Sequence, residues 1–350
     1  MSFTKKKFTT MMKTFLLHGP TDFRLTEKPI PTLGDDQVLI QTKVTGICGS
    51  DVHYFKHGYC GNFIPKQPFA LGHEFAGVVH QIGSNVQNLK VGDEVAVDPS
   101  MPCGTCSYCK SGQYNLCMSM RFLGSASCDP HIDGSMGQFV VMPCSNCFVL
   151  PQGISLSDAA MLEPLSVAMH AVRQVPHIAG KTVLITGGGP IGQLILRVAR
   201  AFGAYKITVS DVSQYSREFA LKSGAYDVID PLDENALKTL DGYDIVFEAS
   251  GVPSALSNGI QVLKRGGSLV LVGTLPENFT IAGNLIMSKQ LRLLGSFRFA
   301  NVFEEAIKLV ASGIINLEGM VTNVYPFEET QMAMQRALEK NETMKIQIVS

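Results

Sequence analysis

The fold of this 350-residue chain is decided by the stretch Val183-Leu184-Ile185-Thr186-Gly187-Gly188-Gly189-Pro190-Ile191-Gly192, an apolar strand that runs into a G-x-G-x-x-G turn. Apolar residues at helical spacing follow at 193–202. In such a turn the first glycine permits the tight bend, the second lets the backbone approach a pyrophosphate, and the third allows close helix packing. The free N–H groups at the helix N-terminus attract phosphate. The stretch therefore predicts a dinucleotide site formed by Gly187, Gly189, Pro190, Ile191 and Gly192.

An acidic residue that binds the ribose hydroxyls is expected about 20 residues after this turn, at the end of the next strand. Asp211 occupies that position, after Thr208-Val209-Ser210. A carboxylate there repels a 2′-phosphate, so the sequence favours NAD, with NADP left open because Arg217 lies one helical stretch further along. The alternative for Arg217 is an exposed arginine on a helix.

The two halves of the chain differ in pattern. The first 150 residues carry short alternating apolar runs broken by glycine and proline, which is typical of a β-rich, barrel-like domain. From Lys181 onward, short apolar runs alternate with helical patterns, which predicts a doubly wound parallel sheet and an α/β fold. The expected parallel strands are 182–186, 207–210, 226–229, 244–248, 268–272 and 291–294.

The tail of the chain carries an amphipathic helix at 302–312 and an alternating strand at 345–349. We expect a terminal strand of this kind to return to the first domain, which makes that domain discontinuous. A chain of this length usually forms two domains. We therefore predict a discontinuous first domain (1–158 and 300–350) and a cofactor-binding domain (159–299).

The composition limits the classes of partner. Hydrophobic residues make up 45% and charged residues 17%, and the net charge is -1, so no basic surface for nucleic acid is indicated. The basic N-terminus is followed by only three apolar residues, Phe15-Leu16-Leu17, which is too short for a signal peptide. No apolar run approaches bilayer length. We expect a cytoplasmic protein without nucleic-acid or membrane partners.

Four cysteines in one short loop indicate a metal. Cys103, Cys106, Cys109 and Cys117 follow the spacing C-x2-C-x2-C-x7-C. Four thiolates at this spacing close a tetrahedral zinc site with no open position, as a structural zinc requires. The alternative is a pair of disulfides, but the chain has nine cysteines, and their clustering favours metal ligation. We predict a structural zinc lobe at about 100–120.

A further pair of cysteines, Cys144 and Cys147, repeats the C-x2-C spacing. On the strand expected at 139–150, a separation of three residues points the two side chains to opposite faces. This favours packing over metal binding.

A second group of metal-ligand residues lies in Gly46-Ile47-Cys48-Gly49-Ser50-Asp51-Val52-His53 and Gly72-His73-Glu74. A thiolate, an imidazole and a carboxylate from separate loops can hold zinc while leaving its fourth position open. Spacing alone leaves an alternative for each residue, because loop cysteines, histidines and glutamates are commonly structural or solvated.

These motifs, together with Glu163-Pro164-Leu165, resemble in type and order the zinc-containing medium-chain dehydrogenases, and within them the sorbitol dehydrogenase branch. The resemblance covers nearly the whole chain, which starts about a dozen residues early and so leaves Met11 or Met12 as a candidate start. Segments 120–126 and 295–299 are similar to relatives that act on a sugar acid. The resemblance implies a GroES-like catalytic domain, a Rossmann domain, two zinc ions, NAD or NADP, a sugar-acid or polyol substrate, and a homodimer or homotetramer.

The resemblance also implies roles at matched positions, and the implied catalytic residues are Cys48, His73, Glu74, Glu163, Ser50 and His53. The first three would bind the catalytic zinc. Glu163 stands where relatives place either a ligand or a residue that holds the zinc-bound water. Ser50 and His53 match the positions that pass the alcohol proton toward solvent.

Two arginines lie in the segments similar to sugar-acid dehydrogenases. A guanidinium binds a carboxylate bidentately, so a site that selects a sugar acid is expected to contain one. Polyol dehydrogenases also carry an arginine matching Arg298, where it contacts cofactor or a substrate hydroxyl. Arg121 is therefore the candidate for carboxylate recognition, with a surface position as its alternative. Arg298 is the candidate contact to cofactor or substrate.

Two other classes of protein remain as alternatives at this point. A binding module built on the cysteine lobe would use the lobe as its working surface, which the missing basic stripe disfavours. A zinc-free quinone reductase would keep the glycine turn and lack Cys48 and the His73-Glu74 pair. Metal content separates the three classes.

Overall fold

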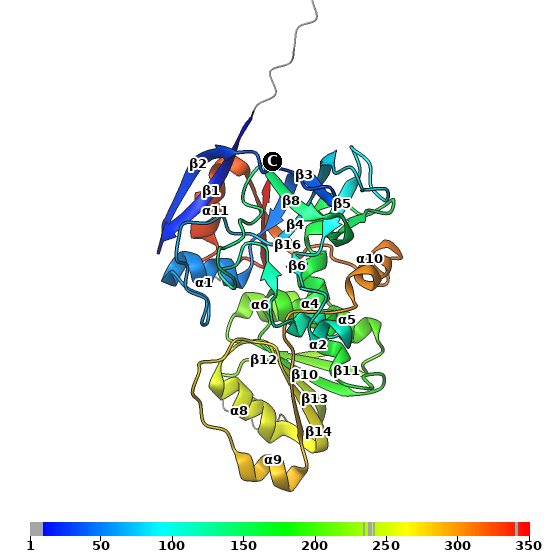
Figure 1. Cartoon of the computed structure of the whole chain (residues 1–350). Coiled ribbons are helices and arrows are strands. Elements are labelled where there is room, and N and C mark those ends of the chain that lie inside the picture. Colours follow the sequence, from blue (N-terminus) through cyan, green and yellow to red (C-terminus); the bar gives the residue numbers. More distant parts are fainter. Residues whose placement is uncertain (1–9, 234, 237–239, 241, 340–341) are drawn as a thin grey trace, which may run out of the picture.

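The computed structural model describes residues 10–350 except 234, 237–239, 241, 340 and 341. Residues 1–9 of the predicted first domain therefore lie outside the described residues. The described elements form two parts, each built around one large sheet, with helices α4 and α5 between them (Figure 1). No helix among the described residues is long and apolar enough to cross a bilayer.

The upper part in Figure 1 contains a seven-stranded sheet. Its strand order is β16-β17-β3-β4-β5-β9, and β8 pairs with β3. The strands are β3 (Gln37–Gly46), β4 (Glu74–Ile82), β5 (Glu94–Val97), β8 (Phe139–Pro143), β9 (Cys147–Val149), β16 (Val321–Pro326) and β17 (Lys345–Val349). Strands β1 (Met11–Gly19) and β2 (Asp22–Pro29) form a separate antiparallel hairpin. The β-rich character predicted for the first 150 residues is confirmed.

The C-terminal strand returns to this sheet, as the sequence pattern predicts. β17 pairs antiparallel with β3, with Gln347 opposite Gly46 and Val349 opposite Val44. Both faces of β17 are buried up to Ile348, so its polar residues Lys345 and Gln347 are buried together with Ile346 and Ile348. The end of the chain therefore lies beside the loop that carries Cys48.

The lower part is a six-stranded sheet in which every pairing is parallel. Its order is β12-β11-β10-β13-β14-β15, the doubly wound arrangement predicted from the sequence. The strands are β10 (Thr182–Thr186), β11 (Lys206–Ser210), β12 (Asp227–Ile229), β13 (Tyr243–Glu248), β14 (Leu263–Leu271) and β15 (Arg292–Gly295). All six predicted strands are confirmed, although β14 starts five residues earlier than position 268.

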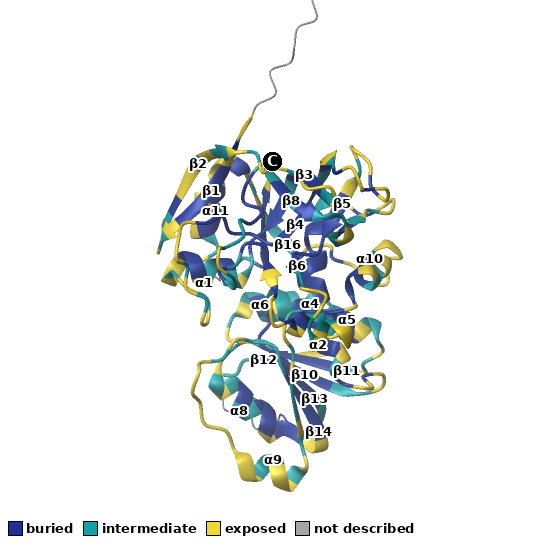
Figure 2. Cartoon of the chain, in the orientation of Figure 1, coloured by how far each residue is buried: buried dark blue, intermediate teal, exposed yellow. Residues whose placement is uncertain are grey.

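Helices α5 (Pro190–Ala201), α6 (Gln214–Lys222), α8 (Pro253–Val262) and α9 (Gly283–Lys289) connect these strands. The central strands are buried on both faces (Figure 2). Burial on both faces explains their short, continuous apolar runs, which made them recognisable in the sequence.

A single apolar core joins the two parts. It contains α3 (Leu156–Ala160), α4 (Leu162–Arg173) and α10 (Phe303–Ala311), together with side chains from both sheets. Phe303 of α10 lies 5.1 Å from Phe148 of β9 and 5.9 Å from Phe299, ring centre to ring centre. The predicted helix at 302–312 is confirmed as α10.

The strand predicted at 139–150 is wrong, because it is two strands separated by a 3₁₀ turn at Cys144–Asn146. The Asn146 amide donates to the carbonyl oxygens of Asp98 (2.9 Å) and Ser100 (2.6 Å), and these bonds replace strand pairing at the break. Cys147 is buried in the apolar core beside β5, and burial raises the pKa of its thiol. Packing is therefore the structural role of Cys147.

Candidate active site and metal centres

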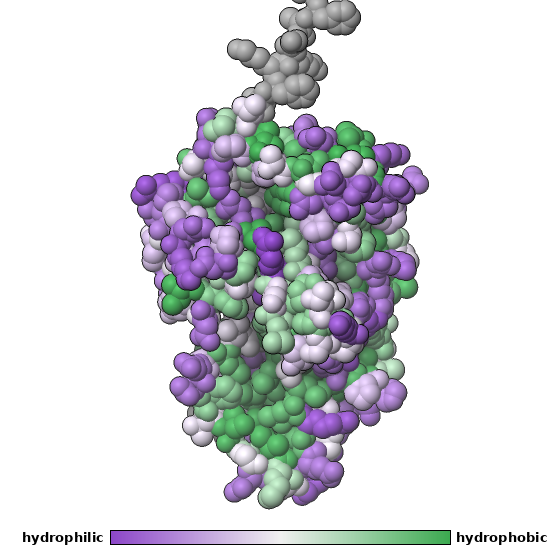
Figure 3. All heavy atoms as spheres, viewed as in Figure 1, coloured by the Kyte–Doolittle hydropathy of each residue, from purple (hydrophilic) through white to green (hydrophobic). Residues whose placement is uncertain are grey.

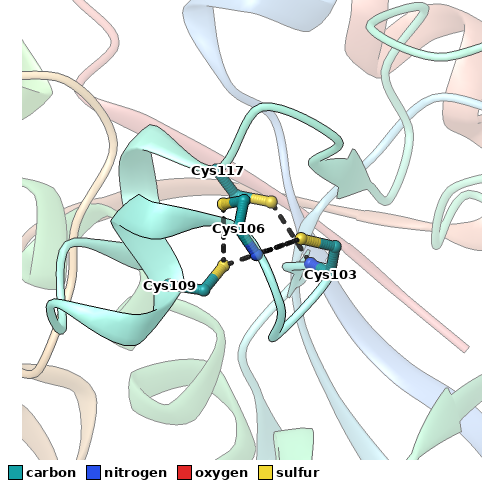
Figure 4. Close-up of side chains that lie close together, drawn as sticks. All are labelled: Cys103, Cys106, Cys109 and Cys117. Carbon is teal, nitrogen blue, oxygen red and sulfur yellow. Dashed lines mark hydrogen bonds between the residues drawn. The ribbon is translucent and has the colours of Figure 1, made fainter.

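The four clustered cysteines point toward one another at one end of the loop that contains α2 (Ser107–Lys110) (Figure 4). Their sulfur atoms all lie within 4.8 Å of one another. The Sγ atom of Cys109 lies 3.5 Å from that of Cys106 and 3.9 Å from that of Cys103. A disulfide needs about 2.05 Å, so these contacts are not S–S bonds. The spacing and convergence fit a closed four-thiolate site.

Backbone and hydroxyl donors around the lobe stabilise negative sulfur. The Thr105 amide and hydroxyl and the Cys106 amide lower the pKa of Cys103 to about 5. Backbone donors also lower the pKa of Cys106, whereas burial and the neighbouring thiols raise that of Cys109. Thiolates are the form that binds zinc. A cation bound by all four sulfurs would stabilise every one of them as a thiolate, including Cys109, whose pKa the neighbouring thiols raise.

The second group of ligand residues is assembled by strand register. β3 ends at Gly46, which pairs with Glu74 at the start of β4. Cys48 then caps helix α1 (Gly49–His57), and His73 immediately precedes β4. The ligand atoms of Cys48, His73 and Glu74 consequently lie within 4.8 Å of one another. The structure therefore brings together the three residues predicted to hold a catalytic metal.

The chemistry of this group fits a cation. Burial, followed by the charge of Glu74, raises the pKa of the Cys48 thiol to about 12. His73 Nδ1 is buried and lacks a hydrogen-bond partner among the described residues. A metal ion would stabilise the thiolate and supply a partner to orphaned donor atoms of this kind.

Asp51 positions this group and was missed as a functional candidate in the sequence. Its side chain is fully buried and accepts hydrogen bonds from the backbone N–H groups of Cys48 (2.9 Å) and Gly72 (3.1 Å). Its Oδ1 atom lies 3.8 Å from His73 Nδ1. One carboxylate thus ties together the two loops that carry the ligands. The signal in the sequence that could have pointed to Asp51 is its position two residues before His53 in the first motif.

Lys345 was also missed, because it is about 270 residues from Glu74 in the sequence. It comes from β17, donates to the Ile47 carbonyl at 3.0 Å and forms an ion pair with Glu74. Burial opposes its charge, but Glu74 and Cys48 raise its pKa. The ammonium group therefore offsets the negative charge that these two ligands bring into a buried site.

Glu163 lies in the first turn of α4 and is 5% exposed. Burial raises the pKa of its carboxyl group well above the usual value, and the nearby His73 acts in the opposite direction. Glu163 is not one of the three residues whose ligand atoms all lie within 4.8 Å. It borders the group as an additional carboxyl.

Ser50 and His53 lie on α1, which begins directly after Cys48. Their spacing of three places both side chains on one face of the helix. Ser50 hydrogen-bonds to the Cys48 thiol, and His53 is exposed. The two residues therefore lead from the buried ligand group toward the surface.

The glycine turn has the predicted geometry. Gly187 has a φ of 96°, and a Cβ atom there would lie 2.7 Å from the Ser250 amide nitrogen. A Cβ on Gly192 would lie 1.9 Å from the Gly187 carbonyl oxygen, so α5 can approach the turn only with glycine there. Gly189 caps α5, Pro190 is its first residue and Ile191 follows it, so the free N–H groups of the helix N-terminus lie at this turn.

Asp211 follows β11 and lies beside the turn. Its carboxylate accepts hydrogen bonds from the backbone N–H groups of Gly188 and Ser213, both at 2.7 Å. Arg217 lies in α6 and is only 17% exposed, because it pairs with Asp230 at 3.1 Å and donates to the Asp211 carbonyl. The freely exposed arginine considered as its alternative is therefore wrong.

The structure places Arg298 beside the ligand group. Its guanidinium lies 4.7 Å from the Phe122 ring centre, and Phe122 lies 5.5 Å from the His73 ring in an edge contact. Arg298 also interacts electrostatically with Glu163. Among the described residues it forms no ion pair. We refer to residues 297–301, which include Arg298, as the arginine segment.

The structure does not bring Arg121 into this group. Arg121 and Phe122 form the two-residue strand β7 (Arg121–Phe122), in which successive side chains point to opposite faces. Phe122 faces His73, so Arg121 faces away, and it is exposed. The candidate for carboxylate recognition is corrected from Arg121 to Arg298.

Comparison with known proteins agrees with these geometries. Residues 34–152 match the alcohol dehydrogenase GroES-like domain, and residues 190–312 match the zinc-binding dehydrogenase domain. The chain is 38% identical to sorbitol dehydrogenase of Bacillus subtilis, over 96% of this chain and 97% of that protein. It is 40% identical to D-xylulose reductase A of Aspergillus oryzae, over 91% of each. The crystal structure of L-idonate 5-dehydrogenase from Escherichia coli superposes with a TM-score of 0.92 at 35% identity, covering 97% of this chain and 98% of that one.

Proposed function

Because this chain belongs to the zinc-binding alcohol and polyol dehydrogenase family, we propose that it oxidises a secondary hydroxyl of a sugar acid, as in the conversion of L-idonate to 5-keto-D-gluconate. The coarser statement is that it is a zinc- and NAD(P)-dependent oxidoreductase that acts on a polyol or sugar. The alternative within the family is a sorbitol- or xylitol-type polyol dehydrogenase. Arg298 supports the sugar acid over the polyol, because its half-buried guanidinium forms no ion pair among the described residues.

Cys48, His73 and Glu74 would hold the catalytic zinc, and Glu163 borders them as an exchangeable ligand or water-holding group. Zinc bound there supplies Lewis acidity that lowers the pKa of the substrate hydroxyl. Ser50 Oγ would accept the hydroxyl proton while its own proton moves toward His53, which would pass a proton to solvent; the two side chains share one face of α1. Cys103, Cys106, Cys109 and Cys117 would hold the structural zinc.

The nicotinamide cofactor supplies the hydride acceptor. The turn Gly187–Gly192 and the N-terminus of α5 bind its pyrophosphate, and Asp211 accepts hydrogen bonds from the ribose hydroxyls in place of its present backbone donors. A carboxylate at that position favours NAD over NADP. In this division of labour, 1–158 and 300–350 form the catalytic domain and 159–299 form the cofactor domain.

The substrate assignment is tested by NADH formation with a hexonate and its matching polyol. We expect a higher kcat/KM for the hexonate in the wild type. A charge-assisted hydrogen bond contributes about 1.5–3 kcal/mol, so Arg298→Met should lose roughly tenfold or more on the hexonate alone.

Arg121→Met is the matched control, since it removes an exposed arginine that faces away from the group. It should leave kcat/KM unchanged for both the hexonate and the polyol. A selective loss in Arg121→Met with none in Arg298→Met would reverse the arginine assignment. A wild-type preference for the polyol would favour the polyol dehydrogenase.

A further inference from the structure

The cysteine lobe holds the arginine segment at both ends. Tyr114 lies in the 3₁₀ turn just before Cys117, and its hydroxyl accepts a hydrogen bond from the Asn301 backbone N–H at 2.8 Å. The Asn301 amide donates to the Gly112 carbonyl at 2.8 Å. At the other end, the Asn115 amide donates to the Phe297 carbonyl at 3.0 Å. Three hydrogen bonds thus connect segments that are more than 180 residues apart.

The backbone of the arginine segment needs such support. Arg298 has a φ of 53° and Asn301 a φ of 58°, both in the left-handed region. This region is unfavourable for residues with a Cβ atom, and such conformations persist where surrounding contacts hold them. Phe299, which lies between them, is completely buried. The buried ring and the three lobe contacts together fix the conformation that presents Arg298.

Arg298 also contacts the residues that follow the lobe. Phe122 follows Cys117 by five residues, and its ring lies under the Arg298 guanidinium. The same ring contacts His73. Phe122 therefore connects Arg298 with the ligand group.

We propose that Tyr114, Asn115 and Asn301 are positioning residues through which the cysteine lobe sets the placement of Arg298 and thereby the affinity for an anionic substrate. The inference rests on the proposed function, in which Arg298 contacts the substrate carboxylate. The lobe then has a role beyond folding stability, because its hydrogen bonds to the arginine segment affect the binding of one class of substrate.

A purely structural role for these contacts predicts different behaviour. If they only joined the two parts of the chain, their loss would lower stability and affect acid and polyol substrates alike. Selectivity between the two substrates therefore separates positioning from stabilisation.

The first test compares Tyr114→Phe with wild type. The variant keeps the ring and removes only the acceptor of the Asn301 N–H. We expect KM for the hexonate to rise about three- to tenfold, as for loss of one hydrogen bond, with kcat and the polyol KM changed less than twofold. Hydrogen–deuterium exchange should become faster in the arginine segment. Tyr108→Phe makes the same change on an exposed tyrosine of the lobe. It should change neither the KM for the hexonate nor the exchange rate of the arginine segment.

A double-mutant cycle with Arg298→Met completes the test. Tyr114→Phe should add no further loss on the hexonate when Arg298 is already absent. Equal losses in both backgrounds, equal losses on both substrates, or unchanged exchange in the arginine segment would overturn the proposal. If Arg298→Met itself leaves hexonate KM unchanged, the proposed function fails, and the exchange rates alone decide whether the lobe holds the segment.

Discussion

Lys345 and Glu74 show how much a single buried pair matters at the residue scale. Their side chains are 3% and 1% exposed, so neither charge can be hydrated when its partner is lost. We predict that Lys345→Met lowers the free energy of unfolding by about 3–5 kcal/mol, because it leaves a buried carboxylate uncompensated. Denaturant unfolding with constant zinc measures this.

The double variant Lys345→Met with Glu74→Gln should recover part of that loss, since it removes both charges. Lys56→Met, on the exposed face of α1, is the matched control and should be neutral. A stable single variant would show that solvent or another group compensates Glu74.

Asp211 gives a second prediction at this scale. Its carboxylate lies beside the glycine turn, where a 2′-phosphate would meet it. We expect Asp211→Ser to raise kcat/KM for NADP relative to NAD by roughly tenfold or more, because a repulsion of about 1.4 kcal/mol corresponds to a factor of ten. Steady-state kinetics with both cofactors measure the ratio.

Asp227→Ser makes the same substitution at an exposed position on β12 and should leave the ratio unchanged. Equal use of NAD and NADP by the wild type would contradict the role given to Asp211.

The sequence predicts well which residues of metal-ligand type converge, and it predicts the residues that support them poorly. Cys48, His73 and the lobe cysteines lie in short motifs whose chemistry is visible locally. Lys345 reaches the site only through the pairing of β17 with β3, which no local spacing encodes. Arg121 was favoured because polyol dehydrogenases also carry an arginine matching Arg298. The direction of the Arg121 side chain depends on a two-residue strand that the sequence does not reveal.

At the scale of elements, the cysteine lobe allows a direct test of the structural metal. Opening a closed four-thiolate site forfeits the folding free energy that is linked to metal binding. We expect Cys106→Ser to lower Tm by about 5 °C or more and to remove one zinc per chain. Calorimetry with metal analysis measures both quantities.

Cys60→Ser, outside the cluster, should keep both values near those of the wild type. An unchanged Tm with full zinc content in Cys106→Ser would show that the lobe does not bind zinc.

Elements were predictable where burial is uniform and less so where side chains interrupt the backbone. β10, β11 and β13 are buried on both faces, which makes their apolar runs continuous. The break between β8 and β9 depends on the Asn146 side chain, whose partners Asp98 and Ser100 are more than 40 residues away. A local pattern cannot contain that information.

At the scale of the whole molecule, the lower part in Figure 3 exposes a concentration of apolar atoms. Phe279, Ile281 and Met287 are 39%, 38% and 73% exposed. They lie on and before α9, near β15, which is an edge strand of the six-stranded sheet among the described residues. An unpaired edge with apolar neighbours favours association. We therefore expect a homo-oligomer formed by a second copy at this edge.

We predict that Met287→Glu weakens this association, because it places a charge on an apolar surface that must lose its water on contact. Light scattering coupled to size-exclusion chromatography should show a lower mass at a given protein concentration. Leu232→Glu is the matched control, since Leu232 is equally exposed, at 75%, but lies just after β12 at the opposite edge of the sheet. A monomeric wild type, or equal dissociation in both variants, would contradict assembly through β15.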